Sequence, residues 1–273
     1  MNRQESRDTC KIKPGDIIDR YRILKLLGTG ASGQVFLVDD SGKQFAMKVV
    51  RLPDMHKTKT YTRLKREVEI MKRLDNERIV KLYRVLKGST CIYLICEYVA
   101  GGDLFDKIAL NNQLTETEAR RYFRQIVEGM VYCHSQNISH RDIKPENIMI
   151  TSCDDVKIAD FGLSRIKTQT TVVFDTFCGT LNYVAPELLA KRPYDSKCDI
   201  WSLGIMLYVM LSGRFPYDSD DDEETAHMIL DDQFTFPASI VDGNAKNLIS
   251  QMLQKRPESR PTMIQVAAHQ WLL

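Results

Sequence analysis

The chain has 273 residues, of which 43% are hydrophobic and 27% charged, and its net charge is only +2. This composition suits a soluble globular protein and argues against disorder. The length allows one large domain with two cores, or two ordinary domains. Because the net charge is close to zero, no global basic field would attract a nucleic acid, and we expect no nucleic-acid partner.

The N-terminus, the apolar stretches and the cysteines indicate the compartment. The first ten residues, MNRQESRDTC, lack the apolar core of a signal peptide. The longest apolar stretch, 200–211, is shorter than the about 20 residues that cross a bilayer, so we expect a buried helix and no membrane contact. The seven cysteines are scattered without a Cys-x-x-Cys pair. Free thiols without structural zinc are the simplest interpretation, and we expect an intracellular protein, cytoplasmic and/or nuclear.

The first third of the chain is predicted to be rich in strands. Residues 1–18 are polar and are interpreted as an N-terminal extension. From Tyr21 the pattern alternates as in strands, with a turn at Ser41 and Gly42. Apolar residues at helical spacing predict one helix over 60–74. Two further strands are expected at 79–86 and 91–99.

Helices dominate the chain after Gly101 and Gly102. Thr115 and Glu118 have the spacing of a capping box, and an apolar helical face follows them up to residue 136. Further helices are expected at 199–212, 243–254 and 263–272. We therefore predict a domain over 19–273 with two lobes, 19–99 and 100–273, joined by a hinge at 97–101.

A glycine-rich segment, GTGASGQV at 28–35, contains the pattern G-x-G-x-x-G. In a dinucleotide-binding Rossmann fold this pattern lies between a strand and a helix. Here the residues after Gly33 continue as a strand, which favours a strand–turn–strand flap whose backbone closes over phosphates. The alternative is an ordinary glycine hairpin, and the pattern alone does not decide between the two.

Lys48 lies on an apolar strand shortly after that hairpin. It is either solvated at the strand edge or directed inward to neutralise phosphate, if a carboxylate holds it. Glu67, on the inward face of the following helix, is the expected holder. Glu69 is a competitor, but it would point about 200° away around the helix.

The segment SHRDIKPENIMI at 139–150 gathers polar groups of several kinds. Asp142, Lys144 and Asn147 lie within six residues, and the apolar strand VKIADFG then ends at Asp160. Two acids, a lysine and an amide in this order suit an aligned hydroxyl and magnesium-bound phosphates. Their assembly after a glycine flap and a strand lysine is unlike a chance arrangement.

With these residues in view, the chain resembles the eukaryotic protein kinases over nearly all of 21–272. The resemblance rests on GTGASGQV, FAMK, HRDIKPEN, DFG and APE, which occur in the order typical of the family. It implies an α+β, bilobal protein kinase fold, with a small antiparallel β-sheet lobe carrying one main helix and a larger, mostly helical lobe. It also implies transfer of the γ-phosphate of ATP to a protein hydroxyl, with Mg²⁺ as cofactor.

The resemblance assigns a role to each matching residue. Asp142 accepts or orients the substrate hydroxyl proton, and Lys144 stabilises charge on the phosphoryl group. Lys48, oriented by Glu67, holds the α- and β-phosphates. The flap approaches the phosphates at Gly28, Gly30 and Gly33. Magnesium is held by Asn147 and Asp160.

The resemblance also places the adenine. Its roof is expected from Val35 and Ala46, its floor from Met149, and its backbone hydrogen bonds from Glu97 and Val99. Cys96 matches the gatekeeper position. Because it is smaller than the residues common there, we expect a modest extra pocket behind the adenine.

The motif HRDIKPEN and Thr180 resemble those of serine/threonine kinases, where a threonine at this position binds the catalytic acid and lysine. The segments 97–108 and 202–217 resemble the calcium/calmodulin-dependent kinase group in its broad sense. Within it, 175–189 is most similar to checkpoint kinases, with Snf1-type kinases close behind. Asp103 matches the acid that meets arginine three residues before the phosphosite, or else it holds the ATP ribose.

The arginine before the catalytic acid, Arg141, indicates control by phosphorylation. Thr176 in the activation segment matches the phosphorylated threonine of related kinases, and Arg165 is placed to share the contact. A phosphate carries about −1.5 to −2 charge and forms several charge-assisted hydrogen bonds. We expect weak activity until an upstream kinase, or a second copy of the chain, phosphorylates Thr176.

Three competing interpretations concern other features of the sequence. A catalytically silent, ATP-binding pseudokinase scaffold would usually have lost one of the catalytic residues, and Lys48, Asp142, Asn147 and Asp160 are all present. The basic helix around 57–73 suits a solvated face better than a nucleic-acid site. The acidic run 218–224 either attracts basic partners or is a solvated loop, and the second is the commoner case.

Overall fold

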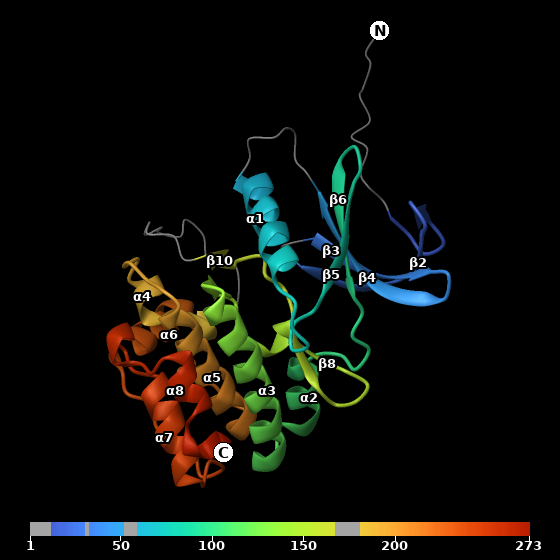
Figure 1. The fold of residues 1–273 in the computed structure, drawn as a ribbon. Coiled ribbons are helices and arrows are strands. Elements are labelled where there is room, and N and C mark those ends of the chain that lie inside the picture. The colour runs from blue at the N-terminus through green and yellow to red at the C-terminus, as the bar shows by residue number, and fades with distance from the viewer. Residues whose placement is uncertain (1–11, 31–32, 52–58, 167–180) are drawn as a thin grey trace. The chain divides into compact units, whose positions relative to one another are not determined.

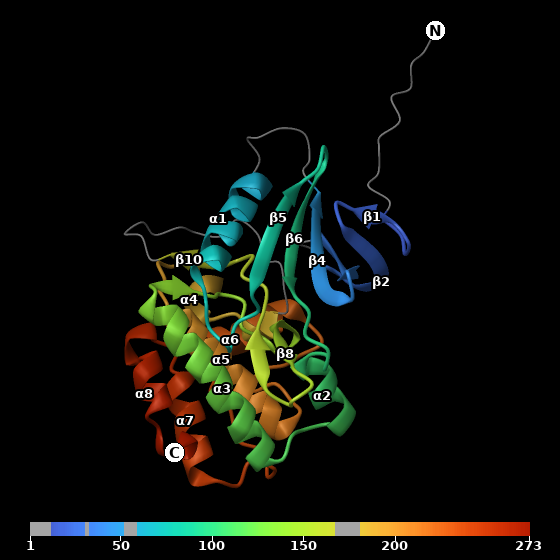
Figure 2. The same ribbon diagram turned by 45° about the vertical axis from the view of Figure 1, so that its right-hand side comes forward.

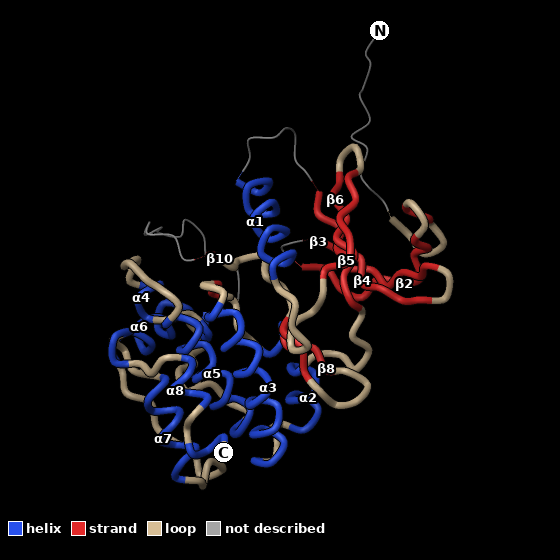
Figure 3. The backbone as a smooth tube through the Cα atoms, viewed as in Figure 1, coloured by secondary structure: helices blue, strands red, loops and turns tan. Residues whose placement is uncertain are grey.

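The computed structural model describes residues 12–30, 33–51, 59–166 and 181–273. It divides into two compact units, one formed by 1–68 and 80–98 and the other by 69–79 and 99–273. Figure 3 shows that the first unit is mainly strands and the second mainly helices. This is the α+β kinase fold that the sequence predicted.

The first unit is built on one antiparallel six-stranded sheet with the strand order β1-β2-β3-β4-β6-β5. It carries most of the helix α1, Lys59–Arg73, close to the predicted 60–74. Its strands are β1 (Ile17–Ile18), β2 (Tyr21–Gly30), β3 (Gly33–Asp40), β4 (Lys43–Arg51), β5 (Leu82–Lys87) and β6 (Cys91–Glu97).

One face of this sheet carries the core of the first unit. Because side chains alternate along a strand, the odd-numbered residues of β4 share a face. Phe45, Met47 and Val49 accordingly pack with Phe36 and Val38 of β3. Tyr21, Ile23, Cys91 and Ile95 complete the buried cluster.

The start of the described chain belongs to this sheet, although it was predicted as part of an extension. Gly15 N donates to Ile23 O, and Ile23 N donates to Asp16 O, at 2.9 and 2.8 Å. Ile12 and Ile18 pack against the core cluster. These isolated apolar residues in a polar segment gave no periodic signal, which is why the sequence did not reveal them.

The second unit is a helical body with two small strand pairs, β7–β10 and β8–β9 (Figure 1 and Figure 2). The helix α5 packs against α3 and α7, and α3 packs against α8. Its helices are α2 (Leu104–Asn111), α3 (Glu116–Ser135), α4 (Pro186–Leu189), α5 (Lys197–Ser212), α6 (Asp222–Asp231), α7 (Gly243–Met252) and α8 (Met263–Ala267). Its strands are β7 (Ile138–Ser139), β8 (Ile148–Ile150), β9 (Val156–Ile158) and β10 (Arg165–Ile166).

Two helical predictions in this unit are confirmed. The capping box of Thr115 and Glu118 begins α3, with both reciprocal hydrogen bonds present. The apolar stretch 200–211 lies in α5, whose residues from Cys198 to Ser212 are all buried. None of the helices in the described part of the chain combines the length and apolar character that a membrane-spanning segment needs.

Two other predictions in this unit need correction. The helix expected over 263–272 ends at Ala267, because the backbone of His269 is extended and its side chain accepts a hydrogen bond from Trp271 N. The acidic run 218–224 is a solvated loop only in part, since α6 begins within it. Asp221 caps that helix by accepting from Glu223 N, and the acids of the first turn complement the helix dipole.

The segment 75–79 belongs to the helical unit because its contacts lie there. The predicted boundary between the two lobes was instead between residues 99 and 100. Asp75 N donates to the hydroxyl of Tyr132 at 3.0 Å. Arg78 forms ion pairs with Glu128 and Asp155 at 3.1 and 3.5 Å. Ile158 N donates to Arg78 O at 2.8 Å.

A buried ion pair lies in the helical unit. Arg260 donates to both carboxylate oxygens of Glu187 at 2.8 and 2.7 Å, and the two residues are 2% and 4% exposed. The remaining guanidinium hydrogens go to the carbonyls of Gln254, Lys197 and Lys255. A buried charge pair with its hydrogen bonds complete is held firmly, but either partner alone is costly.

We therefore predict that Arg260→Met lowers the free energy of unfolding by about 3–5 kcal/mol, because it leaves the Glu187 carboxylate buried alone. The double variant Glu187→Leu with Arg260→Met should be more stable than Arg260→Met alone. Urea denaturation of the three proteins measures both. Equal stability of the single and double variants would contradict a stranded charge.

Candidate active site

The sheet brings several predicted site residues to one face. Val35 lies directly opposite Lys48, and Ala46 lies directly opposite Cys96. Directly opposed residues, and residues two apart on a strand, share a face. Val35, Ala46, Lys48 and Cys96 therefore project from the face opposite to the core of the first unit.

On this face Lys48 has the carboxylate partner that the sequence indicated. Its Nζ lies 2.7 Å from Glu67 Oε1, and the two side chains are only 12% and 7% exposed. Glu69, two residues further along α1, is not the partner in this ion pair. Since a buried carboxylate fixes the ammonium in place, the lysine is oriented in advance for an anion.

The glycine-rich segment forms the end of a hairpin, with β2 ending at Gly30 and β3 beginning at Gly33. Gly33 has φ +131, and a Cβ there would lie 2.2 Å from Val49 O, so only glycine fits. Of the described residues, none lies within 4 Å of the Cβ positions of Gly28 and Gly30. The strand after Gly33 rules out the Rossmann interpretation, which requires a helix.

The 140–147 loop draws three predicted residues together in the second unit. Asn147 Nδ2 donates to the backbone oxygen of Asp142 at 2.7 Å and to its Oδ2 at 2.9 Å. Lys144 Nζ lies 3.2 Å from the same Oδ2. Within the described residues Asp142 Oδ1 has no partner, so this oxygen is available to accept a proton or a hydrogen bond.

Asn147 and Asp160 supply the oxygen atoms that suit a hard divalent cation such as magnesium. The amide nitrogen of Asn147 is directed at Asp142, which leaves its carbonyl oxygen for a metal. Asp160 has a left-handed backbone, φ 57, and its Oδ1 accepts from Gly162 N at 3.1 Å. The backbones are linked, because Ala159 N donates to Asn147 O at 2.8 Å. The residues present therefore fit the predicted ion.

The 140–147 loop is anchored by Asp199 of α5, which is fully buried. Its carboxylate accepts from His140 N at 3.0 Å and from Arg141 N at 2.7 Å. His134 Nε2 lies 2.8 Å from Asp199 Oδ2. Burial alone would raise the pKa of Asp199, but the hydrogen bond and positive field of His134 and the N–H of Arg141 hold it below its ordinary value.

Arg141 is a partly exposed cation with a neutral partner. Its NH1 donates to the hydroxyl of Tyr194 at 3.1 Å, and the guanidinium lies 4.7 Å from the centre of that ring. Its Nε is buried and makes no hydrogen bond to any described residue. Within the described residues Arg141 forms no ion pair, so its charge is not neutralised there.

A model of the protein kinase domain family matches residues 21–272. The chain belongs to the protein kinase family. This membership agrees with the fold and with the 140–147 loop.

The kinase domain is similar to several plant kinases. It is 40% identical over 259 residues to CBL-interacting serine/threonine-protein kinase 8 of Arabidopsis thaliana, covering 94% of this chain and 58% of that protein. It is 40% identical over 257 residues to CBL-interacting protein kinase 24 of Oryza sativa subsp. japonica, covering 93% of this chain and 56% of that protein. The chain thus spans little more than half the length of these relatives.

A relative from another lineage is similar over nearly the whole kinase domain. The chain is 37% identical over 271 residues to the probable serine/threonine-protein kinase MARK-A of Dictyostelium discoideum, covering 98% of this chain and 25% of that protein. These relatives are consistent with a serine/threonine kinase of the Snf1 type, the second of the two subgroups that the sequence indicated.

Two further predicted residues of the kinase domain, Asp103 and Met149, lie side by side in the helical unit. They form an isolated antiparallel bridge. Gly101 N donates to Ile150 O, and Ile150 N donates to Gly102 O, both at 2.9 Å. The Asp103 carboxylate caps α2 by accepting from Asp106 N at 2.9 Å, and partial burial raises its pKa.

Five other predicted residues are less fully placed. Val99 is buried in the helical unit. Glu97 lies at the end of β6, and its N–H donates to Lys81 O at 2.8 Å. Arg165 lies on β10 opposite Ser139, while Thr176 and Thr180 lie outside the described residues.

A charge cluster that the sequence did not reveal fixes the turn between β8 and β9 beside Asp103 and Met149. Asp154 accepts from Tyr122 and Arg121 of α3, and its Oδ1 lies 3.3 Å from Lys107 Nζ of α2. The hydrogen bond from Tyr122, with those from Arg121 and Lys107, lowers the pKa of Asp154 to about 2. No local pattern links these residues, because they come from three separate segments.

The Asp154 cluster should make stability depend on pH. The folded-state pKa lies below the unfolded value of about 3.9, so the stabilisation is fully present above about pH 4 and is lost as the pH falls toward about 2. The difference in urea midpoint between wild type and Asp154→Asn should therefore be largest near neutral pH and shrink below about pH 4.

A matched control is Asp220→Asn, which changes an exposed acid of the acidic run. Its carboxylate contacts no other described residue. Its effect on the midpoint should be small at every pH. A difference for Asp154→Asn that stays constant down to acid pH would argue against this cluster.

Proposed function

We propose that the chain is the catalytic domain of a protein serine/threonine kinase, which transfers the γ-phosphate of MgATP to serine and threonine hydroxyls. The observation that carries this proposal is the arrangement around Asp142. One carboxylate oxygen is held by Asn147 and Lys144, and the other forms no hydrogen bond or ion pair with a described residue. That geometry suits a base that receives a hydroxyl proton.

Each residue then has a physical task in this reaction. Asp142 Oδ1 orients the substrate hydroxyl and accepts its proton. Lys144, 3.2 Å from Oδ2, keeps positive charge beside the reacting oxygen. Lys48, held by Glu67, would contact the α- and β-phosphates, and Asn147 and Asp160 would hold Mg²⁺, which neutralises phosphate charge when bound. Positioning and charge, rather than covalent chemistry, account for the rate.

The proposed substrates are proteins with basic residues upstream of the phosphorylated hydroxyl, most of all arginine at minus three. Asp103 supports this preference. It lies at the N-terminus of α2 and is half-buried, with one carboxylate oxygen capping the helix. An arginine would complete the ion pair that such a carboxylate favours.

Phosphate transfer to an oriented peptide library tests both statements. Wild type should label serine and threonine peptides, best with arginine at minus three, and Asp142→Asn should lower the rate by about 10²–10⁴-fold. ATP binding by both proteins is the control. Transfer absent from wild type despite ATP binding would favour a pseudokinase scaffold, and indifference at minus three would remove the role of Asp103 in specificity.

We further propose that phosphorylation of Thr176 activates the domain. Support comes from Arg141, which adjoins Asp142 in the chain and forms no ion pair with any described residue. Its Nε is buried and has no described hydrogen-bond partner. A phosphate would supply the missing anion through charge-assisted hydrogen bonds, with Arg165 as a second proposed contact. An upstream kinase or a second copy of the chain would add it.

Thr176→Ala should lower activity by about tenfold or more, the equivalent of losing one charge-assisted hydrogen bond. Phosphatase treatment should have the same effect on wild type and none on the variant. Thr170→Ala tests one of the secondary candidates, which are Thr168, Thr170 and Thr171. Full activity of Thr176→Ala would exclude this threonine as the switch.

A further inference from the structure

The segment 194–199 contacts Arg141 at two points, its side chain and its backbone. Arg141 NH1 donates to the hydroxyl of Tyr194 at 3.1 Å, and Arg141 N donates to Asp199 Oδ1 at 2.7 Å. The guanidinium also lies 4.7 Å from the centre of the Tyr194 ring. Both ends of the arginine are therefore fixed by one short segment of the chain.

This segment is itself held at the start of α5. Lys197 N donates to Asp195 Oδ1 at 2.9 Å, and Cys198 N donates to Asp195 O at 3.4 Å. Cys198 and Asp199 are 2% and 0% exposed. Because Tyr194 directly precedes this turn, its position follows from that of a buried helix.

The backbone of Arg141 needs such support because it lies in the left-handed region, with φ 71. For a residue with a Cβ this conformation costs free energy, and it persists only where the surrounding contacts determine it. The strained residue directly precedes Asp142, whose N–H donates to His140 Nδ1 at 3.3 Å. A relaxation of the backbone at Arg141 would therefore reorient Asp142.

The side-chain contacts of Asp142 fix only one of its carboxylate oxygens. Asn147 Nδ2 donates to Oδ2 at 2.9 Å, and Lys144 Nζ lies 3.2 Å from the same atom. The direction of Oδ1, the oxygen that the proposed reaction uses, thus depends on the backbone that carries the side chain. That backbone begins at Arg141.

We propose that Tyr194 is a positioning residue for the phosphotransfer, which acts through Arg141 to hold Asp142 in the geometry of reaction. This inference rests on the proposed kinase activity. The hydroxyl of Tyr194 carries the role, because it is the atom that accepts from the guanidinium. As a neutral acceptor it orients the arginine without neutralising its charge.

Steady-state kinetics of phosphatase-treated protein test the role of the hydroxyl. Tyr194→Phe keeps the ring and removes the acceptor. It should lower kcat by about tenfold, the equivalent of one hydrogen bond to a charged group. KM for ATP and for the peptide should stay within about twofold of wild type, because Tyr194 contributes to the reacting geometry rather than to binding. Since the protein carries no phosphate, the proposed activation by Thr176 does not enter.

A double-mutant cycle tests whether Tyr194 acts through Arg141. Arg141→Met keeps an unbranched side chain and removes the guanidinium. In that background Tyr194→Phe should have no further effect on kcat, since the interaction that it removes is already absent. Two losses that multiply in the double variant would instead mean that Tyr194 acts independently of Arg141.

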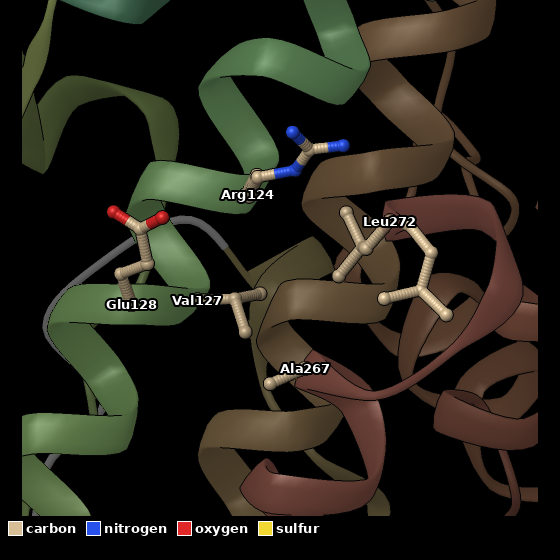
Figure 4. Close-up of a pocket in the computed structure, with 6 residues that line it drawn as sticks. Arg124, Val127, Glu128, Ala267 and Leu272 are labelled. Atoms are coloured by element: carbon tan, nitrogen blue, oxygen red, sulfur yellow. The ribbon is translucent and has the colours of Figure 1, made fainter.

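Two control variants separate positioning from a general loss of stability. Tyr208→Phe also removes a tyrosine hydroxyl that is hydrogen-bonded, here to Thr235 O at 2.8 Å, but about 14 Å along α5 from Asp199. Val127→Ala opens a cavity at a side chain 1% exposed. In Figure 4 Val127 lies in a groove that no residue of the 140–147 loop lines. Both variants should lower the thermal midpoint and leave kcat unchanged.

Amide hydrogen exchange of the peptide 139–147, read by mass spectrometry, gives a measurement that needs no phosphotransfer. Exchange should be several-fold faster in Tyr194→Phe than in wild type, and unchanged in Val127→Ala.

Three results would overturn the role of Tyr194 while wild type transfers phosphate. They are full kcat in Tyr194→Phe, an equal loss of kcat in Tyr208→Phe, and unchanged exchange in Tyr194→Phe. Wild type that transfers no phosphate would instead refute the proposed kinase activity itself, so the two failures are distinguishable.

Discussion

The buried carboxylate of Asp199 determines the position of the 140–147 loop. It lies on α5, the most deeply buried helix, and accepts the N–H groups of His140 and Arg141. A buried charge is stable only when its hydrogen bonds are complete, so the loop and the carboxylate depend on each other. Because His134 of α3 contacts the same carboxylate, α3, the 140–147 loop and α5 meet at one charge.

Sequence spacing was sufficient to predict contacts within one segment or one family motif. The grouping of Asp142, Lys144 and Asn147 follows from a loop only a few residues long, and helical rotation distinguished Glu67 from Glu69. The strand after Gly33 likewise separated a hairpin from a Rossmann turn. Most of the fold, and these particular contacts of the candidate site, could therefore be predicted.

Contacts between separate segments could not be predicted in this way. Tyr194 beside Arg141, and Tyr122 and Lys107 around Asp154, are joined only by the packing of the helical unit. A polar side chain carries no sequence signal for a partner 30 or more residues away. The same reason applies to the start of the chain, where Ile12 and Ile18 enter the core without any periodic pattern.

The contact between Arg141 and Tyr194 bears on how quickly and how tightly an anion could be captured. A long, flexible arginine normally loses rotamer entropy when it first binds an anion. Here the hydroxyl and the ring of Tyr194 already hold the guanidinium, so most of that entropy is lost during folding. An arriving phosphate would meet an ordered receptor, and the change between the two forms would be mainly electrostatic and therefore sensitive to ionic strength.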